Sequence, residues 1–330
     1  MSQIQILIAQ NVVAQNTAGE VTELNNKEVY MKVVGVYKNG NYKVTIFDNG
    51  TKIRETEDDE FIPNRLESVD MKITNKCDIG CPFCHEKSTP DGEHADLNNP
   101  IIDTFLPYTE IAIGGGNPLC HPQLEDFLRH LKELRCFPSM TVNQKHFIEE
   151  YDRIVQLYNE KLFYGLGISI TNLTKEFADK VSQIPGAVIH VIAGLTNLES
   201  LKQMKELGIK KVLILGYKVF GRGEDFYNQT IQDNINNLRD NMQEIKTLFE
   251  VLSFDNLAIE QLNVKSLMSD EEWAEFYMGD DGGYTMYIDM VNCNYGQSST
   301  STQRFELLST INDMFLDIRA KKLENVKLGD

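Results

Sequence analysis

Three cysteines lie within eight residues, at Cys77, Cys81 and Cys84, with the spacing CxxxCxxC. They are close enough along the chain to bind one metal centre without help from the rest of the sequence. A structural zinc site needs four protein ligands, whereas an iron-sulfur cubane held by three thiolates keeps its fourth iron open for a ligand that is not protein. The spacing therefore indicates a metal site that these thiols alone do not close.

A zinc knuckle, with His85 or a distant residue as the fourth ligand, is the alternative to a cluster. A disulfide framework is not expected from six cysteines in a chain of 330 residues, and clustered cysteines in a reducing compartment favour metal chemistry. Cys120, Cys136 and Cys293 do not form a second motif, so we expect them to be buried spectator thiols.

The cysteine stretch resembles the cluster motif of the radical S-adenosylmethionine (SAM) superfamily, including the aromatic residue before the third cysteine, here Phe83, for which the resemblance implies a role in binding the cofactor. The resemblance covers residues 69–223. It implies a single 4Fe-4S cluster, whose free iron is chelated by the amino and carboxylate groups of SAM. It further implies that an electron from the cluster cleaves SAM to methionine and a 5′-deoxyadenosyl radical, which takes a hydrogen atom from the substrate.

A run of glycines follows the second predicted strand, at Gly114, Gly115 and Gly116, with Asn117 after it. Without side chains the backbone can approach a ligand closely. The run resembles the Gly-Gly-Glu-Pro motif of the superfamily, whose backbone binds the amino group of SAM. Asn117 stands where the family often has glutamate, but a neutral amide can still accept a hydrogen bond from an ammonium group. We expect the nearby His121 to be structural.

Five further residues at strand ends match positions that contact SAM in the superfamily. The resemblance implies contacts from Asn143, Ser169, Ile192, Gly194 and Leu215. Ordinary packing at the ends of strands is the alternative for each of them.

A loop with cationic residues follows the sixth predicted strand. It contains Tyr217, Lys218 and Arg222, and a cation here could meet the SAM carboxylate or an anionic substrate through charge-assisted hydrogen bonds. A solvated loop is the alternative. Cys293, close to Tyr295, could face the active site as a hydrogen-atom donor.

The elements that must position these residues begin near residue 69, where short β runs start to alternate with helical patterns. That alternation predicts parallel βαβ units and an α/β fold, a partial (β/α)6 TIM-like barrel. An open doubly wound sheet is the competing architecture. In both, ligands gather at the C-terminal ends of the strands, where the candidate residues lie. The predicted strands are 69–73, 111–113, 139–142, 165–170, 187–192 and 211–215.

We predict three units along the chain: a small β-rich N-terminal unit (1–68), the radical SAM partial barrel (69–250) and a C-terminal α+β extension that covers it (251–330). The first contains predicted strands at 28–36 and 41–47, joined by a hairpin turn. A long amphipathic helix is predicted over 231–248. The extension contains predicted strands at 257–262 and 284–291, with a helix between them that starts at a Ser269 capping box and ends at Gly279, and a closing helix from Phe305 to Ile318.

Composition excludes several classes of protein. A net charge of −17 argues against duplex nucleic acid as a partner. No apolar run is long enough for a membrane span, and the N-terminus lacks the pattern of a secretion signal. We therefore expect a soluble cytoplasmic protein, with no membrane or nucleic-acid partner.

The expected function is a radical SAM enzyme acting on a small molecule or nucleoside. A first alternative is modification of a peptide or protein side chain, with residues 1–68 as the docking unit. A second is a non-catalytic zinc- or cluster-binding interaction protein. The enzyme would also need a one-electron reductant such as a flavodoxin or ferredoxin. The sequence assigns no acid or base, and it does not name the substrate.

Overall fold

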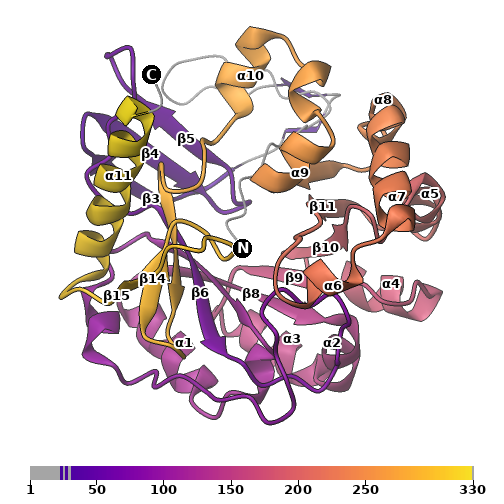
Figure 1. Cartoon of the computed structure of the whole chain (residues 1–330), viewed down its shortest axis with the longest axis horizontal. Helices are drawn as coiled ribbons and strands as arrows, with labels where there is room; N and C mark the ends of the chain where they lie inside the picture. The colour runs from indigo at the N-terminus through magenta and orange to yellow at the C-terminus, as the bar shows by residue number, and fades with distance from the viewer. Residues whose placement is uncertain (1–22, 25–26, 29–30, 329–330) are drawn as a thin grey trace.

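The computed structural model describes residues 23–24, 27–28 and 31–328 (Figure 1). Its largest part is a ten-stranded sheet with the order β12-β11-β10-β9-β8-β7-β6-β13-β14-β15. The strands from β12 to β13 pair in parallel, and β14 and β15 are antiparallel additions at one edge. Among the described helices, none has the length and apolar character that a membrane crossing requires.

Seven parallel strands follow one another in both sequence and space. Each predicted strand of the barrel is present, and a seventh strand, at 251–254, continues the series. From β6 to β12 the order runs in one direction, as the predicted partial barrel requires, and only the later β13 is added on the other side of β6. No pairing joins β12 to β15 among the described strands, so the barrel is open. The strands are β6 (Ser68–Thr74), β7 (Glu110–Gly115), β8 (Phe137–Asn143), β9 (Gly165–Ser169), β10 (Ala187–Ile192), β11 (Lys211–Leu215) and β12 (Val251–Phe254).

Helices connect these parallel strands, as crossovers must. The predicted helix over 231–248 is two helices, because the backbone of Asn241 leaves the helical region (φ −108°, ψ 13°) and its side chain donates to Asn237 O. The connecting helices are η1 (Pro100–Thr104), η2 (Pro118–Cys120), α1 (Leu124–Glu133), α2 (Gln144–Glu149), α3 (Tyr151–Asn159), α4 (Lys175–Ser182), α5 (Leu198–Glu206), α6 (Arg222–Phe226), α7 (Gln229–Asp240) and α8 (Met242–Ile245).

The C-terminal residues return to the other edge of the sheet, where β13 pairs with β6. The predicted strand at 257–262 is wrong: this segment is helix α9, which begins because the Asp255 side chain accepts from Ala258 N. The Ser269 capping box is confirmed, but its helix ends at Phe276 instead of Gly279, and Phe305 lies in a strand before the closing helix. The elements are α9 (Asn256–Gln261), η3 (Val264–Leu267), α10 (Asp270–Phe276), β13 (Thr285–Asp289), β14 (Asn294–Gly296), β15 (Phe305–Glu306) and α11 (Ile311–Leu328).

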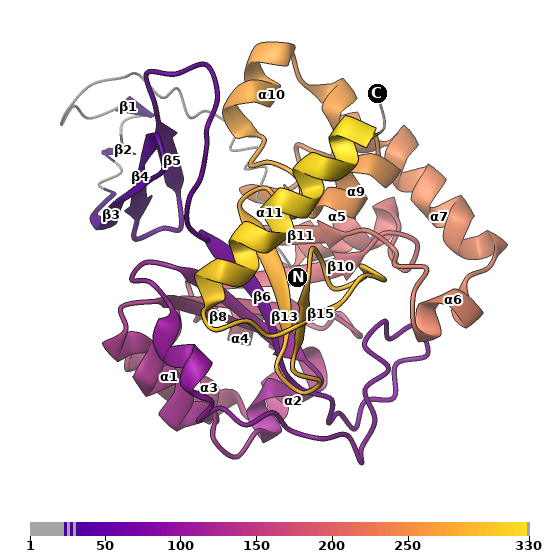
Figure 2. The ribbon, with the colours of Figure 1, turned by 60° about the vertical axis from the view of Figure 1, so that its left-hand side comes forward.

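The N-terminal residues form a separate antiparallel sheet of β3 (Val33–Asn39), β4 (Tyr42–Phe47) and β5 (Lys52–Glu55), set apart from the large sheet in Figure 2. The predicted hairpin between 28–36 and 41–47 is present, although residues 29 and 30 lie outside the described residues. Its turn needs Gly40, which has φ 59° and where a Cβ would lie 1.7 Å from Ile62 O. The two-residue strands β1 (Glu23–Leu24) and β2 (Lys27–Glu28) pair with each other.

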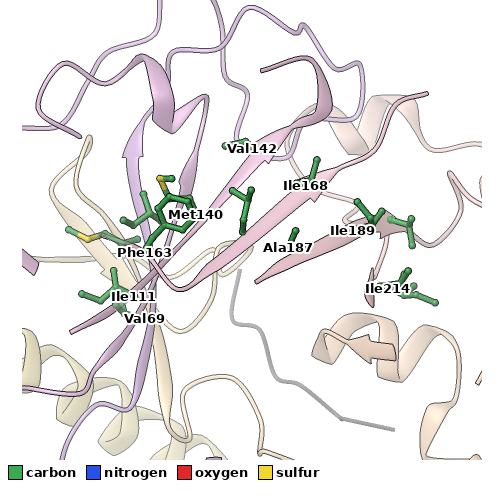
Figure 3. Close-up of a cluster of buried hydrophobic side chains, with 14 of the residues drawn as sticks. Val69, Ile111, Met140, Val142, Phe163, Ile168, Ala187, Ile189 and Ile214 are labelled. Carbon is green, nitrogen blue, oxygen red and sulfur yellow. The ribbon is translucent and has the colours of Figure 1, made fainter. Parts of the chain in front are cut away.

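The two faces of the barrel strands differ in chemistry. On β6, Val69, Met71 and Ile73 belong to the main apolar cluster, which also contains residues of the surrounding helices and of the neighbouring strands (Figure 3). The alternate residues Asp70 and Lys72 point to the opposite face, because side chains alternate along a strand, and both are buried. The strand β6 therefore directs apolar side chains to one face and the ionisable side chains of Asp70 and Lys72 to the other.

Candidate cluster and cofactor site

The three motif cysteines lie on a loop that closes on itself at the end of β6. We call residues 77–88 the cysteine loop. Its base is fixed by backbone hydrogen bonds, from Cys77 N to Thr89 O (2.8 Å) and from Thr89 N to Asn75 O (3.0 Å). Within it, Cys84 N donates to Cys81 O (3.3 Å). The sequence therefore folds this segment into a compact turn at the C-terminal end of a parallel strand, where ligands of such sheets bind.

The thiols of the cysteine loop are free, half-buried and electrostatically coupled. Burial raises the pKa of the Cys77 and Cys81 thiols, and the neighbouring Cys84 sulfur raises the pKa of both further. Three thiols that share one surface-accessible loop fit the donor set of a cluster with an open iron. Bound metal would lower these pKa values, because thiolates are the form that ligates.

One further group near the loop has donor atoms in reach of a metal. The Cys77 sulfur, an Asp78 oxygen and a His146 nitrogen all lie within 4.8 Å of one another. His146 Nε2 is already hydrogen-bonded to Asp78 Oδ1 (2.6 Å). His85, the fourth zinc ligand in the alternative interpretation, instead places its Nε2 3.4 Å from both Glu86 Oε1 and Lys218 Nζ.

The glycine run packs directly against the start of the cysteine loop. Gly116 N donates to Thr74 O and Asn117 N to Lys76 O, each at 2.7 Å. A Cβ on Gly115, which has φ 105°, would lie 2.4 Å from Thr74 O, and one on Gly116 would lie 2.2 Å from Lys76 O. Close approach of two loops thus requires glycine at both positions.

The other two members of this run have different surroundings. A Cβ on Gly114 would meet no atom within 4 Å, so the space beside this residue is open. The Asn117 side chain accepts from Leu119 N (3.1 Å) and caps η2. His121 is buried, with one ring nitrogen 3.0 Å from Ala95 O and the other accepting from Gln123 N, in keeping with the structural role expected for it.

The five predicted cofactor contacts at strand ends lie in two neighbouring pairs, with Gly194 apart from both. Asn143 pairs in register with Ser169, and Ile192 with Leu215, all at the C-terminal ends of their strands. Asn143 Oδ1 accepts from Lys145 N and so begins α2. Gly194 instead packs on α7, where a Cβ would meet Ile231 Cγ2 at 2.5 Å.

The cysteine loop is held to the rest of the protein by polar contacts on two sides, and the cysteine motif predicts neither of them. On one side Asp78 pairs with Lys145 (2.7 Å) and His146, and hydrogen bonds from both hold its pKa well below the usual range. On the other side lies a buried network. There Lys72 Nζ is 3.0 Å from both Glu86 Oε2 and Asp289 Oδ2. The sequence feature that could have indicated this network is Lys72, a charged residue within a predicted strand.

Electrostatics within the network keep its histidine neutral. Burial and the adjacent Lys218 lower the pKa of His85 to about 4. Burial alone would raise the pKa of Glu86, but His85 and Lys72 outweigh it and hold that pKa low. Tyr287 donates to the Glu86 carboxylate at 3.3 Å.

The loop after β11 meets the cysteine loop. Lys218 Nζ donates to Ser299 Oγ (2.8 Å), while Tyr217 is buried and donates from its hydroxyl to Gly223 O (2.8 Å). Arg222 is engaged by backbone carbonyls of the cysteine loop at Cys81 and Ser88. The segment is therefore not a solvated loop.

The three cysteines outside the motif differ from one another. Cys136 is buried as predicted, and burial raises the pKa of its thiol to about 12. Cys120 and Cys293 are exposed, so the prediction of buried spectators is wrong for both. Cys120 Sγ donates to Asn117 O (3.0 Å), which places it beside the glycine run.

No family model matches this chain, and no curated protein is similar to it in sequence. Solved structures are similar in fold. SuiB from Streptococcus suis bound to its precursor peptide SuiA has a TM-score of 0.55 and 13% identity, over 78% of this chain and 67% of that one. SuiB bound to S-adenosylmethionine has a TM-score of 0.54 and 15% identity, over 78% and 69%.

A weaker likeness, with a TM-score of 0.45 and 16% identity over 72% of this chain and 67% of that one, is to coproporphyrinogen III oxidase (HemN) from Escherichia coli, a radical SAM enzyme. At identities this low, the SuiB structures establish the fold alone. The chain has the fold of SuiB, which is the partial barrel that its resemblance to the radical SAM superfamily implied.

Proposed function

We propose that this chain is a radical SAM enzyme. The observation that carries the proposal is the packing of the glycine run on a loop that presents Cys77, Cys81 and Cys84 at the C-terminal edge of a partial barrel. When bound there, a reduced 4Fe-4S cluster supplies the electron that cleaves SAM and yields the radical that abstracts hydrogen from a substrate. The likeness to a SAM-bound SuiB structure supports a SAM site in the same fold.

The chain's own residues would bind and orient the cofactor. Gly114, with open space beside it, can offer its backbone to the amino group of SAM. The strand-end pairs Asn143 with Ser169 and Ile192 with Leu215 would border the rest of the molecule. By enclosing the cofactor, these residues would keep water from the reacting atoms. They would also hold one C–H bond of the substrate close to those atoms.

For the substrate, we propose a peptide or protein side chain. This choice rests on the likeness to SuiB in complex with its precursor peptide. A small molecule or nucleoside remains the alternative, and a flavodoxin or ferredoxin is the proposed reductant.

Anaerobic reconstitution tests the enzyme. We expect the wild-type chain to bind about four irons and four sulfides, and to release 5′-deoxyadenosine from SAM with dithionite as reductant. Cys81→Ala should reduce that release to background, because two thiolates do not hold the cluster. Cys136→Ala, which removes a thiol outside the motif at the N-terminal end of β8, is the matched control and should keep full SAM cleavage. Stoichiometric zinc without 5′-deoxyadenosine would instead favour an interaction protein.

A further inference from the structure

The segment Gly221-Arg222-Gly223 lies against the cysteine loop. Arg222 N donates to Cys84 O (3.1 Å). Gly221 has φ 63°, and a Cβ there would lie 2.3 Å from the His85 carbonyl oxygen; a Cβ on Gly223 would lie 2.3 Å from Lys218 O and 3.3 Å from Phe83 O. The two glycines therefore permit a backbone approach that any side chain would block, and they flank a single arginine.

The Arg222 guanidinium holds two points of the cysteine loop at once. Its Nε donates to Cys81 O (3.0 Å), and its Nη1 and Nη2 donate to Ser88 O (3.0 and 3.1 Å). These carbonyls lie on opposite sides of Cys84 in the sequence. The planar fork of arginine can make such contacts together, whereas a lysine ammonium is a point charge without that geometry.

Within the described part of the chain, no carboxylate forms an ion pair with this guanidinium. None of the ion pairs within residues 31–328 involves Arg222, and its hydrogen bonds go to neutral carbonyl groups. A 4Fe-4S cluster bound by three thiolates is negative and becomes more negative on reduction. A fixed cation beside its ligand loop therefore favours the reduced form.

We propose that Arg222 is a positioning residue for the cluster: it braces the cysteine loop through the Cys81 and Ser88 carbonyls, and its unpaired charge stabilises the reduced cluster. The second part of this proposal, that the charge stabilises the reduced cluster, rests on the proposed function. The bracing half concerns the protein alone and can be measured before any metal is added.

Three variants separate bracing from charge. Arg222→Gln removes both, Arg222→Lys keeps the charge but loses the fork, and Arg239→Gln is the control, an exposed arginine on α7. In the metal-free protein, hydrogen exchange at the amides of residues 77–88 should rise about tenfold in Arg222→Gln and in Arg222→Lys, because charge-assisted hydrogen bonds are lost. Arg239→Gln should leave it unchanged.

In the reconstituted protein, the midpoint potential of the cluster should fall in Arg222→Gln and stay near the wild-type value in Arg222→Lys. The rate at which a chelator removes iron should rise in both. An unchanged exchange rate in both variants overturns the bracing, and an unchanged potential in Arg222→Gln overturns the role of the charge. If Arg222→Gln does not fold, hydrogen exchange in Arg222→Lys tests the bracing. The role of the charge is then tested by comparing the cluster potential of Arg222→Met with that of the wild type.

Failure of the proposed function has a different signature. A wild-type chain that takes up no cluster would contradict the enzyme assignment. The exchange experiment would still decide whether Arg222 braces residues 77–88.

Discussion

Two glutamates, the buried Glu67 and the largely buried Glu86, attach segments to the large sheet, and their ion pairs differ. Glu67, just before β6, ties the N-terminal sheet to the barrel and has two cations, Lys52 Nζ at 3.3 Å and Arg54 Nη2 at 2.9 Å. Glu86 ties the cysteine loop to the barrel and pairs with Lys72, which also pairs with Asp289, each at 3.0 Å. Glu67 therefore has two cationic partners, one of which also pairs with Glu110, whereas Glu86 and Asp289 share Lys72.

The difference indicates what each junction does. Glu67 is fully enclosed and is also hydrogen-bonded by Tyr42 and Asn39, as a permanent joint between two sheets needs. The Glu86 network lies beside the predicted cluster, and both Glu86 and Asp289 depend on their ion pairs with Lys72. Removing one partner of a buried pair strands the other charge, so the network in which two carboxylates share Lys72 should be the more fragile.

Removing the shared cation should have the largest effect on stability. Lys72→Met leaves Glu86 and Asp289 side by side, both nearly enclosed, so we expect a loss of about 4 kcal/mol in the free energy of unfolding. Urea denaturation at pH 7 measures it. Lys210→Met is the control, since Lys210 pairs with Glu250 on the surface at side-chain exposures of 67% and 63%, and it should lose less than about 1 kcal/mol. Similar losses in the two variants would contradict the comparison.

Removing the charge of Glu67 should cost less. Burial alone would raise the pKa of Glu67, but Lys52 and Arg54 outweigh it and lower that pKa from 4.5 to about 2. Its contribution to stability is therefore fully present above pH 4.5 and is lost as pH falls towards 2. We expect Glu67→Gln to lose about 3 kcal/mol at pH 7, while Lys52 keeps its pair with Glu110.

The pH dependence provides the check on Glu67. Unfolding free energies measured between pH 5 and pH 2.5 should fall more steeply in the wild type than in Glu67→Gln, so that the two curves converge. Parallel curves would show that Glu67 does not titrate between folded and unfolded states in the way its surroundings imply.

Local patterns predicted the barrel well, because each strand and connecting helix has its own periodicity. The order of six strands, the cysteine loop after the first and the Ser269 capping box are all properties of short segments. The error at 257–262 is also local, because a short apolar run fits a strand or a helix equally well. The Asp255 side chain caps the first turn of this segment and so favours a helix. Asn241 likewise divided a helix whose apolar spacing looked continuous.

The attachments of the site could not be predicted, because they join residues far apart in sequence. Arg222 contacts a carbonyl 141 residues away at Cys81, and Asp78 contacts His146 across 68 residues. Lys72 and Asp289 become neighbours only because the chain returns to place β13 beside β6. No motif spacing encodes such contacts. The one available sign was a charge, such as Lys72, within an otherwise apolar strand.

The exposed attachment of the cysteine loop gives the smallest expected effect. Lys145 and Asp78 are about half exposed, with side-chain exposures of 48% and 54%, so solvent screens their attraction. We expect Lys145→Ala to change the free energy of unfolding by less than about 0.5 kcal/mol, and by still less in 1 M salt. The buried His146 keeps its hydrogen bond to Asp78, so the cluster content after reconstitution should equal that of the wild type. A loss of cluster in Lys145→Ala, measured as iron per chain, would mean that the loop depends on its exposed side as much as on Lys72.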